Sequence, residues 1–595
     1  MTSFAMGAAC LVFLFLGPAV ATAESRYVID LAKSKFSILR VSLDTACSSF
    51  PCEFQLPSWS ATYQLRNFSQ YVGPVRAETA DGEQIELRKT GPSRWRIASA
   101  PQRAIRLIYE VRADRDGPFG SQASSNRVNV NLAQILLYAE AQRAKAVYLK
   151  FENVPKGFSE ALALPRWGDY YEASSYDRLV DTPVLLADFK EDAFDIRGKP
   201  IRVVAYGPGA WQRMGSLRST ARKVVKTALD LMGEDSSFEG YTFVYVFAHA
   251  GGGGMEYRDG TLIFGPADCP TCGMDELTAH EFFHRWNVKR IRAASMEPVD
   301  YSRPVPSPSL WFAEGVSSTY ARYLLAASGI ITERDMLSRL EERINQYESR
   351  PARLTQSAEE SSIDAWLEGD PSYHRPDRSV SYYLKGELIG YLLDLEIRGR
   401  TENRRSLDDV LRRLDHDYAQ QGRLFEDTRG LIEIASDVAG SDMTAVFDEL
   451  VRTAAPIDWD HYLGRAGLHL ERISRTWRDS GMSLGSPPGE GIIVAMIAPA
   501  GTAEKAGIQV GDRLIEIDGQ RVIGSAEAVL GQLRDEDKPQ SITVYRKGAK
   551  ITLRLRTIEK LETVHRVVSL ARITAAQQLV RDGWLKRQTA KSLTP

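Results

Sequence analysis

No stretch of this sequence is both long and apolar enough to cross a membrane, and neither sign of charge dominates it. Lys and Arg number 75 against 77 Asp and Glu, so the formal net charge is only -2. Without an excess of basic residues, the chain has no field that would draw it to nucleic acid or to anionic lipid. Cysteine is scarce too, at 5 in 595 residues. We therefore expect neither a membrane span nor a nucleic-acid partner.

Residues 1–23 differ from the rest of the chain because they contain no charged side chain. They include an apolar run at 8–16, and the small residues Ala21 and Ala23 stand just before Glu24. This pattern is typical of a secretory signal peptide, although the amino end lacks the usual Lys or Arg. The run is too short for a spanning helix. We expect a signal peptide at 1–23 and export of the mature chain, either to a periplasm or out of the cell.

Removal of that segment leaves four cysteines in two close pairs, Cys47 with Cys52 and Cys269 with Cys272. In an exported chain such pairs most simply form two local disulfides, although the sequence does not fix the connectivity. For the second pair, half of a structural zinc site or a redox motif is the alternative. The chain has no other cysteine pair with the spacing of Cys269 and Cys272, and no thioredoxin-like strand pattern surrounds this pair. A disulfide is therefore favoured over a zinc site or a redox motif.

The length predicts about three to five domains, and the apolar pattern changes along the chain. Short alternating runs such as 27–30 and 104–111 indicate strands, whereas helical periodicity appears at 211–233 and strand-like runs return near 468. We therefore expect a multidomain α+β protein. Its expected segments are a signal peptide at 1–23, a β-sandwich-like domain at 24–165, a mainly helical domain at 166–465, a β-rich domain at 466–560 and a helical tail at 561–595.

Two histidines and a glutamate in the helix-compatible stretch 278–287 have the spacing that zinc chemistry needs. His280 and His284 are four residues apart, so on a helix both rings leave one face and reach a single ion. Glu281 can then act as general base toward a metal-bound water. A bare match also occurs by chance in helix-rich proteins, where such a pair is a hydrogen-bonded core element. A catalytic zinc takes a third protein ligand, for which Glu314, in a second helix-compatible run, is the best candidate.

A glycine-rich run at 251–257 follows the apolar strand expected at 241–248. A phosphate-binding loop is unlikely there, because no Lys-Ser or Lys-Thr follows and no helix opens. A flexible hairpin is the structural alternative. The functional interpretation is an edge strand along which an extended peptide lies, with Glu256 receiving the substrate's α-ammonium group. The predicted substrate-binding residues are Gly253, Gly254, Met255 and Glu256.

The motif His280-Glu281-x-x-His284-x-Trp286, the later Glu314 and the 253–256 run resemble the gluzincin aminopeptidases, whose Gly-x-Met-Glu-Asn strand binds the substrate amino terminus. The wider strings at 280–292 and 311–315 closely resemble the glycyl aminopeptidase family of PDZ-containing gluzincins. The 29 residues between His284 and Glu314 are similar to that family's spacing. The resemblance implies a thermolysin-like catalytic domain, one zinc ion and removal of small amino-terminal residues such as Gly and Ala. Tyr257 departs from the motif, which has Asn at that position.

Residues 382–386, Tyr-Tyr-Leu-Lys-Gly, are similar to a further element of these enzymes. In that element a Tyr hydroxyl binds the oxyanion of the tetrahedral intermediate, so by resemblance Tyr383 has this role. A Tyr at the start of a helix more often packs than catalyses. The Lys-Gly context and the neighbouring motifs favour the catalytic interpretation.

Residues 491–497, 500–508 and 511–519 resemble a PDZ domain, with 482–485 where such domains bind the terminal carboxylate of a peptide. A module that only braces the catalytic domain is the alternative. The predicted function is a zinc aminopeptidase acting on peptides with a free amino terminus. The alternatives are a zinc endopeptidase guided by the PDZ domain and a non-enzymatic PDZ scaffold.

Overall fold

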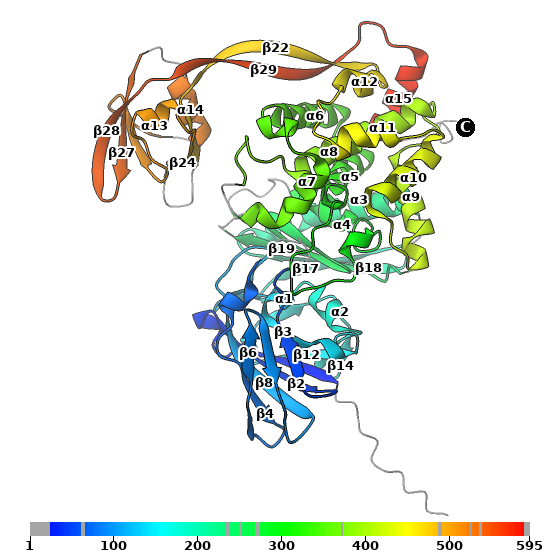
Figure 1. The fold of residues 1–595 in the computed structure, drawn as a ribbon, viewed down its shortest axis with the longest axis vertical. Helices are drawn as coiled ribbons and strands as arrows, with labels where there is room; N and C mark the ends of the chain where they lie inside the picture. The colour runs from blue at the N-terminus through cyan, green and yellow to red at the C-terminus, as the bar shows by residue number, and fades with distance from the viewer. Residues whose placement is uncertain are drawn as a thin grey trace, which may run out of the picture.

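The computed structural model describes residues 24–60, 66–233, 237–248, 252–267, 274–369, 373–485, 491–523, 525–534 and 538–587. The expected signal peptide and the pair Cys269 and Cys272 lie outside the described residues. Figure 1 shows a β-rich amino-terminal region, a helical region next to it, and a small β-domain carried on a long two-stranded arm. No helix among the described residues has the length and apolarity needed to span a membrane.

The amino-terminal region is built on an eight-stranded sheet of order β14-β15-β12-β1-β2-β8-β4-β5. Its strands form because apolar residues alternate with polar ones, as in β8, where Leu107, Tyr109 and Val111 are buried. The strands are β1 (Ser25–Asp30), β2 (Ile38–Ala46), β4 (Arg76–Thr79), β5 (Gln84–Ile85), β8 (Ala104–Arg112), β12 (Val147–Glu152), β14 (Arg166–Trp167) and β15 (Tyr170–Ala173).

Two four-stranded sheets accompany it, of orders β11-β3-β7-β6 and β13-β16-β10-β9. Because β14, β15 and β16 pair with strands of this region, the amino-terminal sheets continue past the boundary expected at residue 165. The strands of the two smaller sheets are β3 (Cys52–Gln55), β6 (Arg88–Gly91), β7 (Arg94–Ile97), β9 (Gln122–Ala123), β10 (Arg127–Asn129), β11 (Tyr138–Ala139), β13 (Ser159–Ala161) and β16 (Leu185–Ala187).

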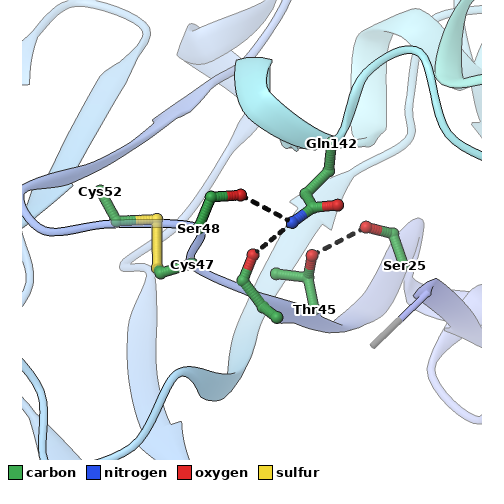
Figure 2. Close-up of a disulfide and its surroundings, with 7 residues drawn as sticks. Ser25, Thr45, Cys47, Ser48, Cys52 and Gln142 are labelled. Carbon is green, nitrogen blue, oxygen red and sulfur yellow. Dashed lines mark hydrogen bonds between the residues drawn. A yellow bond between two sulfur atoms is a disulfide. The ribbon is translucent and has the colours of Figure 1, made fainter. Parts of the chain in front are cut away.

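A disulfide between Cys47 and Cys52 closes the loop from β2 to β3, as expected for the first cysteine pair. Figure 2 shows that the loop is also held from the side by Gln142. The Gln142 amide nitrogen donates to the Ala46 carbonyl at 2.7 Å and to Ser48 Oγ at 3.4 Å. Covalent and hydrogen-bonded contacts therefore fix the same short segment.

The central region contains a five-stranded sheet of order β17-β18-β19-β21-β20. Strands β18, β19 and β21 are parallel, and β20 pairs antiparallel with β21 at one edge. This matches the edge strand predicted for the glycine-rich run. The strands are β17 (Lys190–Ile196), β18 (Lys199–Tyr206), β19 (Tyr241–Ala248), β20 (Gly253–Tyr257) and β21 (Gly260–Pro266).

Helices make up the rest of this region, and one of them lies at its centre. Most side chains of α8 are buried, including the polar Lys385, Glu387 and Asp394. The helices are α3 (Ala210–Met232), α4 (Met274–Phe283), the π-helical turn η5 (Trp311–Val316), α5 (Ser317–Ala327), α6 (Glu333–Glu348), α7 (Ala358–Ile363), α8 (Tyr382–Arg400), α9 (Leu407–Asp417), α10 (Asp427–Ala439), α11 (Thr444–Phe447) and α12 (Trp459–Gly464).

Strands β22 (Leu468–Asp479) and β29 (Ile558–Ser569) pair along their full length and form the arm seen in Figure 1. Between them lies a sheet of order β23-β24-β25-β27-β28 with helix α14 (Ala526–Arg534). Residues 561–569, expected within a helical tail, are strand because their β-branched and apolar residues pair with β22. The sheet's strands are β23 (Met482–Gly485), β24 (Ile493–Ile497), β25 (Arg513–Ile517), β27 (Gln540–Arg546) and β28 (Ala549–Leu555).

After the arm, helix α15 (Ala575–Leu585) packs against the helical region and lies within the helical tail expected at 561–595. The Trp584 indole N–H donates to the Tyr323 hydroxyl at 2.8 Å. The Arg587 guanidinium pairs with Asp394 and Asp408 over the Tyr323 ring. The chain that follows the small β-domain is therefore part of the core of the preceding region.

Candidate metal centre and active site

Three predicted ligands converge on one point of the structure. His280 Nε2 and His284 Nε2 are 3.0 Å apart, and Glu314 Oε2 lies 3.5 Å from the first and 3.3 Å from the second. A tetrahedral zinc with bonds of about 2.0–2.2 Å holds its ligand atoms about 3.3–3.6 Å apart. The two distances to Glu314 lie in this range and the distance between the two nitrogens is slightly short, so the side chains fit a zinc ion with only a small adjustment, which a chance His-Glu-x-x-His match would not.

The two histidines come from helix α4 and its continuation, while Glu314 comes from η5. A π-helical turn is rare and recurs at functional sites, because it changes the direction in which one side chain leaves the helix. Here the turn contains Glu314 and runs directly into α5. The second helix-compatible run of the sequence is thus a helix with a local irregularity at the predicted ligand.

Hydrogen bonds orient both imidazole rings for metal binding. His284 Nδ1 lies 2.8 Å from the Asn287 carbonyl oxygen, which only accepts, so Nδ1 carries a proton and Nε2 is the nitrogen that can bind a metal after losing its own. His280 Nδ1 lies 3.3 Å from Ser318 Oγ, whose hydroxyl donates to the Glu314 carbonyl at 3.1 Å. Each ring therefore presents Nε2 to the same point.

Asn287 also ties the two ligand-bearing segments together. Its amide nitrogen donates to the Phe312 carbonyl at 2.7 Å and lies 3.2 Å from Ser317 Oγ. Asn287 ends the stretch 278–287 singled out in the sequence, but no pattern there predicted a role for it. The one feature of the sequence that could have indicated a role is its position three residues after His284. In a turn that follows a helix, the backbone carbonyl of such a residue can reach the His284 ring.

Glu281 and Glu256 are buried beside the three predicted ligands, with 4% and 3% of their surfaces exposed. Burial raises the pKa of Glu281 well above its usual value, against the opposing effect of His284. Burial also raises the pKa of Glu256, opposed by Lys289 and His284. Glu256, Glu281 and His284 form a second group of potential ligand atoms within 4.8 Å of one another.

The charges of the histidine and the carboxylates depend on each other. Burial lowers the pKa of His284, but Glu314, followed by Glu256 and Glu281, reverses this and brings it to about 10. Burial raises the pKa of Glu314, and the two histidines reverse that effect and hold it well below its usual value. Without a metal, the imidazolium of His284 thus supplies the positive charge that these carboxylates require.

Strand β20 passes directly beside Glu281 because Gly254 has no side chain. A Cβ at Gly254 would lie 2.3 Å from Glu281 Oε1, closer than two such atoms can approach. Along β20, Glu256 lies on the metal side, while Met255 belongs to the buried cluster that includes Leu262 and Phe264. The structure thus brings Gly254 and Glu256 to the site, whereas Met255 packs elsewhere.

Tyr383 begins helix α8, and its ring centroid lies 6.3 Å from that of His280. Burial, followed by the carboxylate of Glu314, raises the pKa of Tyr383 well above its usual value. Its hydroxyl therefore remains protonated and can donate a hydrogen bond. The predicted metal and catalytic residues therefore lie close together, with Glu281, His284 and Glu314 buried and His280 and Tyr383 partly exposed.

Three protein-family models match this chain. The family model for M61 glycyl aminopeptidases matches residues 274–389, the one for the Peptidase M61 N-terminal domain matches 26–188, and a PDZ domain model matches 493–546. No curated protein matches the chain in sequence. These matches cover the β-rich region, the predicted metal centre and the small β-domain on the arm.

Solved structures similar to this chain include the following two. An aminopeptidase N family protein from Idiomarina loihiensis superposes with a TM-score of 0.81 at 23% identity, covering 94% of this chain and 100% of that one. An M1 zinc metallopeptidase from Deinococcus radiodurans gives a TM-score of 0.47 at 14% identity, covering 73% of this chain and 95% of that one. The first likeness confirms the expected fold class, with a β-rich region, a helical catalytic domain and a PDZ domain.

Proposed function

Since the chain belongs to the M61 glycyl aminopeptidases and is a zinc aminopeptidase, we propose that it removes single amino-terminal residues from peptides, with Gly and Ala preferred. His280, His284 and Glu314 hold the zinc ion in this proposal. The observation that carries it is the triangle of 3.0, 3.3 and 3.5 Å between their ligand atoms. When bound there, zinc supplies a Lewis acid and lowers the pKa of a coordinated water toward about 7.

Glu281 is the proposed general base. Its Oε2 is buried and accepts no hydrogen bond from the described residues, so it is available to a water near the ligand triangle. The raised pKa of this carboxyl favours acceptance of a proton at neutral pH. After the peptide bond breaks, the same carboxyl returns the proton to the leaving amine.

Glu256 and strand β20 are proposed to bind the substrate's amino end. The edge of β20 offers backbone groups to an extended peptide, and Gly254 allows close approach. Glu256 Oε1 is buried and has no hydrogen-bond donor among the described residues, which suits an incoming ammonium group. A carboxylate fixed at this point limits cleavage to the first residue.

Tyr383 is proposed to donate its hydroxyl proton in a hydrogen bond to the scissile carbonyl oxygen as negative charge develops there. Its place near His280 and its protonated state support this role. Loss of one such donor typically lowers turnover about 100- to 1000-fold.

The PDZ domain is proposed to bind the carboxyl end of a peptide. Strand β23 lies at one edge of its sheet, so a peptide can add to it as a further strand. Export from the cytoplasm is also proposed, and the Cys47–Cys52 disulfide supports it because such bonds persist in oxidising compartments.

The deciding experiment is an assay of free-amine and amine-acetylated peptides with the wild type and Glu256→Gln, before and after chelation. We expect hydrolysis of the free-amine peptides only, loss with chelation and recovery with zinc. Glu256→Gln should lose activity on free amines selectively. Equal cleavage of acetylated peptides would instead favour an endopeptidase guided by the PDZ domain, and no hydrolysis by the zinc-loaded chain would favour a scaffold.

A further inference from the structure

Lys289 is a largely, though not fully, buried cation beside the carboxylate proposed to bind the substrate amine. Its Nζ lies 3.8 Å from Glu256 Oε1 and 2.8 Å from Asp181 Oδ1. The Lys289 side chain is only 10% exposed and that of Glu256 only 4%. A cation in such a position costs desolvation energy, which its two carboxylate neighbours offset.

The backbone of Lys289 is fixed to the metal helix, because its amide donates to the His284 carbonyl at 3.0 Å. Asp181, by contrast, directly follows helix α2 (Tyr176–Val180) of the amino-terminal region. A second bridge runs parallel to the first, in which Asp259, beyond the end of β20, pairs with Arg178 at 2.8 Å and Arg285 at 3.1 Å. The end of α2 is therefore linked by ion pairs to Lys289 and to the turn that follows β20.

The distance from Lys289 to Glu256 has a specific consequence. At 3.8 Å, the ammonium attracts Glu256 Oε1 without forming a short hydrogen bond to it. The oxygen keeps its lone pairs for a donor from the substrate. At the same time the attraction opposes movement of the Glu256 carboxylate toward His284, with which it forms the second group of potential metal ligands.

We propose that Lys289, held by Asp181, is the positioning residue that keeps Glu256 turned toward the substrate amine and away from the metal. This inference rests on the proposed aminopeptidase function and deepens it. Recognition of the substrate's amino end then depends on an ion-pair chain that begins in the amino-terminal region, Asp181 to Lys289 to Glu256. The substrates this arrangement selects carry a free, positively charged α-amine.

The test compares Lys289→Met, Lys289→Arg and the control Arg290→Met in the zinc-loaded full chain. Arg290 is one residue further along and pairs with Asp415 at 2.9 Å, so its loss removes the same charge without touching Glu256. The probes are glycine hydroxamate and acetohydroxamate, which share the metal-binding group and differ by the α-amine. Their dissociation constants are measured by calorimetry.

We expect Lys289→Met to weaken glycine hydroxamate binding about tenfold or more, as loss of a buried charge partner does, and to change acetohydroxamate binding by less than about twofold. Lys289→Arg should restore most of the difference, and Arg290→Met should leave both constants unchanged. With a free-amine peptide, the Michaelis constant should rise more than the turnover number falls.

Equal weakening of both hydroxamates by Lys289→Met, or no change in either, would overturn the positioning role. Should this variant fail to fold, Asp181→Asn replaces it, because the Asp181 side chain is 27% exposed. Asp181→Asn must then weaken glycine hydroxamate selectively, and unaltered selectivity would also overturn the proposal. Failure of the proposed function itself is distinguishable, because the wild type would then bind both hydroxamates equally and Glu256→Gln would have no selective effect.

Discussion

Gly315 and Gly386 meet where η5 crosses α8, with no space for a side chain between them. A Cβ on Gly315 would lie 2.4 Å from Gly386 Cα, and a Cβ on Gly386 would lie 2.2 Å from the Trp311 carbonyl oxygen. Gly315 follows the predicted ligand Glu314, and Gly386 stands three residues after Tyr383. This contact therefore sets the distance between a predicted metal ligand and the predicted oxyanion donor.

Replacement of Gly386 by Ala should separate the two helices and displace Tyr383. We expect a stability loss of about 1–3 kcal/mol from overpacking and a fall in turnover number with zinc content retained. Thermal unfolding, metal analysis and steady-state kinetics check this. Gly215→Ala is the control, because a Cβ there meets nothing within 4 Å and α3 should gain about 0.5–1 kcal/mol. Normal turnover in Gly386→Ala would contradict the account.

Replacement of Asn287 by Leu should weaken zinc binding. The side chain no longer donates to the Phe312 carbonyl, so η5 and Glu314 lose a link to the metal helix. We expect zinc affinity to fall about 10- to 100-fold, as loss of an outer-shell partner does. Competition with a fluorescent chelator measures it. Asn345→Leu serves as the control, because Asn345 bonds to His565 in the arm and should leave zinc affinity unchanged.

The stability of the zinc-free chain should fall as the pH rises toward 7, in part through Glu368. Burial raises the pKa of Glu368 to about 7, against opposing effects of His374 and Arg66. A carboxyl with a raised folded-state pKa stabilises the fold below its unfolded pKa of about 4.5, and this contribution disappears as pH rises through about 7. The change is at most about 3 kcal/mol.

Chemical denaturation of the chelated wild type and Glu368→Gln between pH 5 and 8 tests this expectation. The difference in free energy of unfolding between the two proteins should vary with pH in that window. The exposed Glu83→Gln is the matched control and should show a constant difference. A constant difference for Glu368→Gln as well would show that this group does not contribute to the pH dependence.

Excision of residues 468–569 should leave a folded aminopeptidase. The two ends of the arm are adjacent, since the Leu570 amide donates to the Gly467 carbonyl at 2.9 Å, so a short glycine linker closes the gap. We expect short peptides to be cleaved with catalytic efficiency within about threefold of the wild type, because this excision keeps α15 and the predicted site residues. Any preference for longer peptides with a free carboxyl end should disappear.

A chain that ends at residue 467 is the comparison for this excision. It also lacks α15, so Asp394 and Asp408 lose Arg587 and the Tyr323 hydroxyl loses Trp584. Removal of one partner from a buried ion pair typically costs about 3–5 kcal/mol. We expect marked destabilisation of this shorter chain by thermal unfolding, and equal stability of the two variants would contradict the docking role of α15.

Local sequence patterns predicted much of the candidate site. The spacing of His280 and His284 and the position of Glu281 follow from helical periodicity alone, and the edge strand at Glu256 follows from a glycine-rich run beside apolar strands. Glu314 and Tyr383 needed more than periodicity, because their distances from the histidines depend on how separate helices pack. Family resemblance supplied Tyr383, and the close contact of Gly315 with Gly386 explains physically why the two motifs belong together.

Contacts between distant segments could not be read from the sequence. Lys289 carries no pattern that indicates Asp181 as its partner, since the two are far apart in the chain and meet only when the amino-terminal region docks. The strand at 558–569 was missed for the same reason, because its pairing partner lies about ninety residues earlier and is exposed to solvent at half of its positions. The helix α15 that follows this strand lies within the helical tail that the sequence predicted.

The arm formed by β22 and β29 has a wider consequence. The polypeptide leaves and re-enters the catalytic core at one place. The domain at the tip is therefore an insertion that does not lie between any two of the residues proposed for chemistry. The tip is therefore a natural graft point. Another peptide-binding domain of similar size, inserted there, would change which peptides are cleaved and leave the proposed active site unchanged.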